Sequence, residues 1–299
     1  MRSFNNNNAI ILINPKAGPK RIIEISDRIH RFSRYFDYAV FEDIDEFRNF
    51  IISHLNSYDF FIAAGGDGTV NSLASELTGT GKILAVLPVG SGNGFAREMG
   101  FRKSIRKLIM DIRGGGSFDI DVLYINGKPC FNLTGLGIDS FVAHDFSNSD
   151  RRGFWSYFAA AVRVVFKLKP VKTEIRFENR TITEDVFMLS VTNTRQFGNH
   201  AIIAPEAVPH DGLLNIVVVK PFPKILMPAF AIRLLTGTLK ESRYINYFSS
   251  PGPVTINTVE TRYHIDGEPV NINSPVTITL RKKALKVLVT RRNKWLKGN

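Results

Sequence analysis

The chain has 299 residues, of which 44% are hydrophobic and 22% charged, so it is long enough for two globular domains with substantial cores. Its single cysteine, Cys130, excludes an intramolecular disulfide and a cysteine-rich metal site, and fits a reducing cytoplasm. The net charge of +12 favours an anionic partner: a nucleic acid, an anionic membrane surface or a phosphorylated substrate. Basic residues accumulate after Glu268, where no acidic residue follows, and a solvated basic face without a partner is the alternative.

No segment of the sequence has the pattern of a membrane anchor. The N-terminal residues contain no apolar run long enough for a signal peptide, and no stretch reaches the roughly 18 apolar residues of a membrane span. The two most apolar stretches, residues 154–168 and 225–239, are interrupted by charged residues or proline. We therefore expect a soluble, cytoplasmic protein.

The first third of the chain alternates short apolar runs with amphipathic segments. We expect strands at residues 9–14, 38–41, 59–64 and 83–87, and helices at residues 21–32, 45–55 and 69–77. Continuous apolar strands separated by helices predict an α/β domain with a parallel sheet that is covered on both faces. In such sheets ligands bind at the carboxyl ends of the strands.

The pattern changes near residues 114–116, after which short strand-like runs predominate. These runs lie at residues 120–125, 186–192, 214–219, 254–256, 263–265, 276–280 and 285–289. Helices are expected only at 154–168 and 225–239, so the second domain is predicted to be a mostly antiparallel β-sandwich. We place the domains at residues 1–117 and 118–290, followed by a basic tail at 291–299, for which packing back on the first domain is an open alternative.

A glycine-rich turn, Gly65-Gly66-Asp67-Gly68-Thr69, separates an expected strand from an expected helix. Its glycines would allow positive φ angles and a close approach of phosphate to the backbone amides. Thr69 is a plausible N-cap of the helix. Asp67 would repel a triphosphate unless it acts through Mg²⁺ and water. The alternative is a tight structural turn with no ligand.

Two further turns lie at the same predicted edge of the sheet. Gly90-Ser91-Gly92-Asn93-Gly94 follows the strand at 83–87, and there Asn and Gly tolerate left-handed geometry while Ser91 offers a hydroxyl. Asn14-Pro15-Lys16-Ala17-Gly18 ends the first strand. Neither the Rossmann spacing nor a Walker motif is present. Three such turns at one edge predict a phosphate-binding site.

The segment His264-Ile265-Asp266-Gly267-Glu268-Pro269 carries two carboxylates close together. By itself it predicts a hairpin turn. Its functional interpretation is a carboxylate that accepts the proton of an attacking hydroxyl, and the residues leave open whether that carboxylate is Asp266 or Glu268.

In this order, the motifs NPKAG, GGDGTVN, LPVGSGNGFARE and IDGEP resemble the diacylglycerol kinase catalytic-domain family of bacterial lipid kinases, whose relatives include sphingosine and ceramide kinases. The resemblance extends over nearly the whole chain. It implies a nucleotide-binding α/β domain and a β-sandwich domain, with ATP and Mg²⁺ as phosphate donor and metal. It also implies a lipid alcohol such as diacylglycerol as acceptor and transient contact with an anionic membrane surface from the cytoplasmic side.

The resemblance also assigns roles to particular residues. The base would be Glu268 or Asp266, with Glu268 favoured, and Asp67 would act through metal and water. A structural Mg²⁺ would be held by the carboxylate of Asp211 and the backbone carbonyls of Val208 and Leu213, the alternative being an Asp-Gly hairpin. The ATP site would be lined by Asn14, Pro15, Lys16, Ala17, Gly18, Gly65, Gly66, Asp67, Gly68, Thr69, Val70, Asn71 and Ser91.

One position departs from the family pattern, because many relatives have Glu where this chain has Ser72, and Glu76 is a candidate substitute. The lipid should also meet an apolar patch in the second domain. Candidates are the aromatic residues Phe141, Phe146, Phe154, Trp155, Tyr157 and Phe158, although core packing is the expected role of most of them. Two other functions stay open: an NAD kinase-like enzyme, because GGDGT also occurs there, and a non-catalytic regulator that binds ATP or lipid. A nucleic-acid binder would explain the charge but none of the glycine-rich turns.

Overall fold

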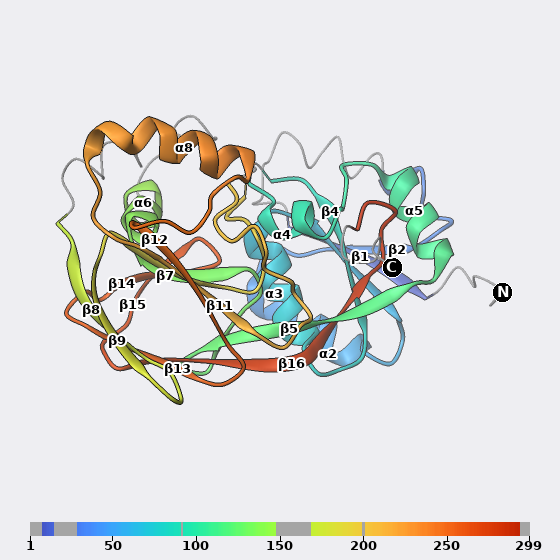
Figure 1. Ribbon diagram of the computed structural model, residues 1–299. Coiled ribbons are helices and arrows are strands. Elements are labelled where there is room, and N and C mark those ends of the chain that lie inside the picture. The colour runs from blue at the N-terminus through green and yellow to red at the C-terminus, as the bar shows by residue number, and fades with distance from the viewer. Residues whose placement is uncertain (1–7, 15–28, 91, 148–168, 199–200, 294–299) are drawn as a thin grey trace. The chain divides into compact units, whose positions relative to one another are not determined.

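The computed structural model describes residues 8–14, 29–90, 92–147, 169–198 and 201–293 (Figure 1). The chain divides into two compact units, Met1–Ile120 with Lys283–Asn299, and Asp121–Lys282. Both divisions fall inside strands, β5 (Ser117–Ile125) and β16 (Val276–Leu288). The chain therefore returns to the first unit at Lys283, whereas the sequence-based division gave residues up to 290 to the second domain.

The first unit is built on a parallel sheet. Its strands follow the order β2-β1-β3-β4-β16, and each neighbouring pair runs parallel. They are β1 (Ala9–Ile13), β2 (Asp37–Val40), β3 (Phe60–Gly65), β4 (Ile83–Pro88) and the last part of β16. β1 and β3 are buried along their whole length, as expected for strands that are covered on both faces. The predicted α/β unit with a parallel sheet is confirmed.

The helices of the first unit are α2 (Ile44–His54), α3 (Asp67–Leu77), α4 (Gly94–Glu98) and α5 (Ile105–Gly114). Local sequence explains where they begin and end. The carboxylate of Asp43 accepts hydrogen bonds from the first-turn amides of α2, and Gly115 ends α5 in the left-handed region with φ 67°. The helix expected at residues 21–32 falls mostly outside the described residues.

The second unit contains two antiparallel arrangements of strands. One follows the order β12-β11-β10-β7-β14-β15, and the other places the beginning of β16 beside β13, β8 and β9. Their bounds are β6 (Lys128–Cys130), β7 (Leu133–Gly137), β8 (Val171–Arg176), β9 (Thr181–Val186), β10 (Met188–Thr192), β11 (Leu214–Val219), β12 (Ile245–Ser250), β13 (Val254–Thr258), β14 (Arg262–Ile265) and β15 (Glu268–Asn271). Residues 276–288 form one strand, where the sequence predicted two.

The two sheets of this unit share one hydrophobic core. Ile216 and Val218 of β11 face it from one sheet, and Ile256 of β13 and Ile278 of β16 face it from the other. Sheets that bury a common apolar layer form a sandwich, so the predicted β-sandwich is confirmed.

Helices cover the other face of the six-stranded sheet, which contains β11. Val217 and Val219, which alternate with the sandwich-facing residues of β11, pack with Val142 of α6 (Ile138–Ser147) and Met227 of α8 (Met227–Thr236). The 3₁₀ turn η2 (Lys224–Leu226) leads into α8 and, with it, confirms the helix expected at 225–239. None of the helices among the described residues is both long and apolar enough to cross a bilayer.

Candidate active site

The first glycine-rich turn connects β3 to α3. The helix begins at Asp67, and its N-cap is Gly66, which has extended backbone angles and no side-chain capping bond. The prediction that Thr69 caps this helix was therefore wrong: Thr69 lies inside the first turn and is buried. The glycine at the N-cap leaves the positive end of α3 without a capping side chain, and such a helix end favours an anion.

The second glycine-rich turn packs directly on the first. The amides of Val89 and Gly90 donate to the carbonyl of Gly65 at 2.9 and 3.3 Å. A Cβ added to Gly90 would lie 2.7 Å from Cα of Gly66, and one added to Gly92 would lie 2.9 Å from Oδ2 of Asp67. The backbones of the two turns are therefore in direct contact.

Close packing, and not a positive φ angle, explains the glycines at positions 65, 90 and 92, where an added Cβ would lie less than 3.0 Å from a neighbouring atom. None of Gly65, Gly66, Gly90 and Gly92 has a positive φ, so that part of the prediction was wrong. The left-handed residue is Asn93, with φ 51°, whose side-chain amide donates to the carbonyl of Gly90 at 2.6 Å. The tolerance of Asn for left-handed geometry, expected from the sequence, is thus used here.

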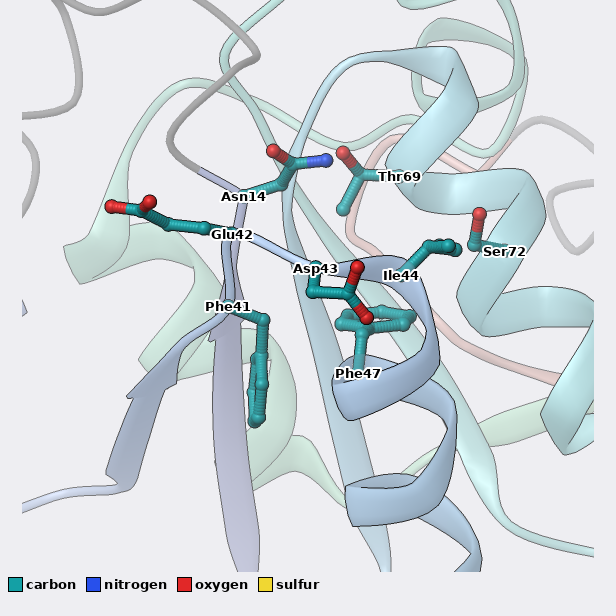
Figure 2. A pocket seen from close by; sticks show the side chains of 8 residues that line it. All are labelled: Asn14, Phe41, Glu42, Asp43, Ile44, Phe47, Thr69 and Ser72. Carbon is teal, nitrogen blue, oxygen red and sulfur yellow. The ribbon is translucent and has the colours of Figure 1, made fainter.

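A pocket of about 200 Å³ lies next to the first turn, at the carboxyl ends of β1 and β2 (Figure 2). It is lined by Asn14, Phe41, Glu42, Asp43, Ile44, Phe47, Thr69 and Ser72. Figure 2 shows the amide of Asn14 directed toward Thr69 and the carboxylate of Glu42 extending away from Ser72. The sequence analysis named Asn14 and Thr69 but missed the residues after β2, whose position at a strand's carboxyl end could have indicated them.

Other sequence-predicted residues of the first unit have ordinary structural contacts or lie outside the description. Val70 is buried in α3, and the carbonyls of Gly68 and Asn71 accept hydrogen bonds from Ser72 and Ser75 one turn later. Glu76, the candidate substitute for the glutamate that many relatives have at position 72, forms an ion pair: its Oε1 lies 3.4 Å from Nε of Arg48. Pro15, Lys16, Ala17, Gly18 and Ser91 lie outside the described residues.

In the second unit, Asp266 occupies the turn between β14 and β15. Its Oδ1 accepts the amides of Asn132 and Leu133 at 2.7 and 3.0 Å, and its Oδ2 accepts the amide of Phe131 at 2.9 Å. The thiol of Cys130 donates to Oδ1 at 3.2 Å. Burial raises the pKa of Asp266, and these four donors act in the opposite direction. Both carboxylate oxygens are thus engaged in holding residues 130–133.

Glu268 begins β15, two residues further along, and is exposed. Within the described part of the chain its carboxylate makes no hydrogen bond or ion pair. Partial desolvation, together with the neighbouring Asp266 carboxylate, raises the pKa of Glu268 above its ordinary value of 4.5. Of the two carboxylates, Glu268 is therefore the one that can approach a substrate and take up a proton.

A network of buried side chains forms hydrogen bonds next to the β14–β15 turn. Nδ1 of His264 accepts the amide of Gly267 at 3.2 Å, and its Nε2 lies 3.1 Å from Oδ2 of Asp139 on α6. Because Nδ1 accepts, we assign the proton to Nε2, which donates to Asp139. The same carboxylate oxygen accepts the hydroxyl of Ser190 at 3.0 Å. The sequence analysis missed Asp139 and Ser190, which are distant from the turn along the chain.

The predicted metal-binding turn contains Asp211, whose Oδ1 accepts the amide of Leu213 at 2.9 Å. Buried Asp121 accepts the amide of Gly212 at 2.7 Å, and Pro209 accepts the amide of Asp121 at 2.8 Å. Desolvation raises the pKa of Asp211, and the charge of Asp121 raises it further. No group of three or more His, Cys, Asp or Glu side chains able to hold a metal occurs among the residues described. Two neighbouring carboxylates with backbone carbonyls nevertheless suit a hard cation.

We predict that Gly90→Ala destabilises the first unit by about 1–3 kcal/mol, because the new methyl group must displace the backbone at Gly66. The matched control is Gly114→Ala at the end of α5, where an added Cβ meets nothing within 4 Å. That change should stabilise by about 0.4–1 kcal/mol through the unfolded state. Urea unfolding measures both variants, and equal effects of the same sign would contradict the packing argument.

We also predict that His264→Phe releases the β14–β15 turn. The amide of Gly267 loses its acceptor, and Asp139 loses a hydrogen bond of the kind that contributes about 1.5–3 kcal/mol. Hydrogen exchange at Gly267 should become faster. His144→Phe is the matched control, since Nε2 of His144 contacts the carbonyl of Tyr263 at 3.1 Å, away from the turn. If the amide of Gly267 keeps its protection from hydrogen exchange in His264→Phe, His264 does not hold this turn.

Comparisons with known proteins agree with this arrangement. Residues 8–125 match the family described as "Diacylglycerol kinase catalytic domain", and residues 133–289 match "YegS C-terminal NAD kinase beta sandwich-like domain". A Bacillus subtilis protein named "Diacylglycerol kinase" is 27% identical over 220 residues, which cover 72% of each chain. "Probable lipid kinase YegS-like" of Citrobacter koseri is 28% identical over 221 residues, covering 70% of this chain and 71% of that protein.

Solved structures share the fold. A crystal structure titled as a diacylglycerol kinase from Bacillus anthracis str. Sterne superposes with a TM-score of 0.73 at 19% identity, covering 95% of this chain and 97% of the other. A further structure from the same organism gives a TM-score of 0.76 at 18% identity and covers 95% and 98% of the two chains. With both of its units matched, the chain belongs to the family of diacylglycerol kinase catalytic domains that carry a YegS-type C-terminal β-sandwich domain.

Proposed function

We propose that this protein is an ATP- and Mg²⁺-dependent lipid kinase that phosphorylates a hydroxyl group of a membrane lipid, most simply diacylglycerol or a related lipid alcohol. The observation that carries the proposal is the close packing of two glycine-rich turns at the carboxyl ends of β3 and β4. The named relatives add support, because both names include a lipid kinase activity.

The first unit would bind the nucleotide. Phosphate oxygens would accept hydrogen bonds from backbone amides at the start of α3, where no side chain occupies the N-cap. The pocket lined by Asn14 and Thr69 would take the remainder of ATP, since it adjoins this turn and includes both polar and aromatic side chains. Pro15, Lys16, Ala17, Gly18 and Ser91 remain predicted contacts from the sequence.

Glu268 would be the general base. It would accept the proton of the lipid hydroxyl while that oxygen attacks the γ-phosphorus and the bond to the β,γ-bridging oxygen breaks, which releases ADP. Asp266 would position the turn, because its oxygens already hold residues 130–133. Its negative charge would also keep the pKa of Glu268 raised and so make that carboxylate a better proton acceptor.

Carboxylates of both units would contribute to binding Mg²⁺ ions. Asp67 would approach a nucleotide-bound ion through water, and Asp211 with the carbonyls of Val208 and Leu213 would hold a structural ion, with Asp121 close by. When bound, Mg²⁺ would neutralise charge on the transferred phosphate. These proposed roles in Mg²⁺ binding are the same whichever lipid is the acceptor.

Two other functions give different outcomes in one assay. The match to an "NAD kinase beta sandwich-like domain" keeps phosphorylation of NAD as an alternative. The assay follows phosphate transfer from γ-labelled ATP with Mg²⁺ to a panel of lipid alcohols in mixed micelles, and to NAD. A labelled lipid supports the proposal and names the acceptor. Label in NAD alone establishes the alternative, and binding of ATP without transfer to any acceptor favours a non-catalytic regulator.

We predict that Glu268→Gln lowers kcat by about 10²–10⁴-fold, because a positioned general base contributes an effect of that size. Glu178→Gln, a change of an exposed glutamate in the same unit, is the matched control and should keep full activity. Asp266→Asn should instead lower stability, since it weakens the hold on residues 130–133. Retention of kcat in Glu268→Gln would remove this residue from the mechanism.

The pH dependence follows from the raised pKa of Glu268. The base must be ionised, so kcat/KM should rise with pH through an acid limb that lies above pH 4.5, the ordinary value for a glutamate. Below that limb the carboxylate is protonated and cannot accept the hydroxyl proton. A pH profile of kcat/KM with a lipid acceptor measures the limb, and a midpoint at or below 4.5 would contradict the role of desolvation.

A further inference from the structure

The outward face of η2 and α8 is unusually apolar for a helix at a protein surface. Ile225 is 84% exposed, Ile232 is 62% exposed and Leu226 is 38% exposed. Ile225 and Ile232 are seven residues apart, which places them on one side of the segment, two helical turns from each other. Figure 1 shows α8 running along the edge of the second unit, beyond α6.

The inward face of the same helix packs on the hydrophobic core of the second unit. Met227 is buried in the core cluster with Val142 and Val217, and Phe230 and Leu234 pack against that cluster. A surface helix that has packed one apolar stripe normally presents polar residues on the other side. Here the exposed isoleucines do not belong to the core cluster, so an external apolar partner explains them better.

The charge around this face identifies the partner. From Gly212 to Lys240 the sequence has no acidic residue, while Lys224, Arg233 and Lys240 are exposed. Exposed aliphatic side chains beside basic ones are the pattern of a surface that inserts into the interface of an anionic bilayer. A second copy of this chain fits less well, since a two-fold contact would bring identical basic side chains together.

We propose that η2 and α8 form a membrane-docking surface, in which Ile225, Leu226 and Ile232 enter the headgroup region and the basic side chains contact anionic lipids. The role of this surface rests on the proposed function: it would hold the enzyme at the membrane that contains its lipid acceptor. The sequence expected an apolar patch among the aromatic residues from Phe141 to Phe158. Of these, Phe141 lies beneath the guanidinium of Arg262, 3.6 Å from Cζ to the ring centre, and residues 148–168 lie outside the description.

The test measures co-sedimentation of the full-length protein with phosphatidylcholine vesicles, with and without phosphatidylglycerol. The double variant Ile225→Asp/Ile232→Asp should bind the anionic vesicles at least about tenfold more weakly, because it removes insertion and adds repulsion. Arg233→Gln should weaken only the binding that depends on phosphatidylglycerol. The matched control is Ile52→Asp, at an isoleucine of α2 that is 58% exposed, and it should bind as the unchanged protein does.

Unchanged vesicle binding in the double variant would overturn the proposal. So would a change from dimer to monomer in that variant, seen by light scattering, because α8 would then cover a second copy. Thermal unfolding checks that the exposed substitutions leave the fold intact. The vesicle assay needs no catalysis, so lost binding with no transfer to any lipid would sustain the docking surface while the proposed kinase activity failed.

Discussion

The structure of the first unit depends on how closely two backbones approach each other. The turns after β3 and β4 are joined by hydrogen bonds to the carbonyl of Gly65, and there is no room for a side chain on Gly90 beside the backbone of Gly66. Asp67, the first residue of α3, lies beside the same turn, since a Cβ added to Gly92 would be 2.9 Å from its Oδ2. A site for phosphate can be made in this way from backbone amides alone, because glycine leaves them accessible and the sheet keeps them in place.

The second unit uses a different constraint, a buried carboxylate that organises backbone. Asp266 gathers three consecutive amides and a thiol from residues 130–133, while His264 holds the other side of the same turn through Gly267 and Asp139. Burying a carboxylate is costly unless its lone pairs are used, and here they are. The consequence is a turn that is held by several hydrogen bonds, while the carboxylate of Glu268 beside it is unengaged in the described part of the chain. Two acids that are neighbours in the sequence thus acquire different chemistry from their surroundings.

The outer surface of α8 adds a feature that catalysis by itself does not require. Both sides of this helix carry apolar side chains, and among the described residues of the second unit one side packs on the core while the other is exposed. A kinase whose acceptor is embedded in a bilayer has a use for such a surface, whereas a kinase of a dissolved nucleotide has none. Under the proposal of a membrane-docking surface, part of the high net charge, which composition alone could not assign to any partner, would act there.

The sequence by itself determined the succession of an α/β unit and a β-sandwich unit, and it placed the glycine-rich turns at one edge of the parallel sheet. Buried parallel strands read as continuous apolar runs, and the glycine-rich turns could be assigned to one edge because parallel strands share their carboxyl ends. Local capping was less predictable: Thr69 has the chemistry of an N-cap, but the helix begins earlier, at Asp67, with Gly66 as its N-cap. Only the tertiary structure showed that backbone amides engage Asp266, because these amides come from residues more than a hundred positions away. For the same reason Asp139, Asp121 and the exposed face of α8 could not be read from the chain, since burial and partners are created by long-range packing.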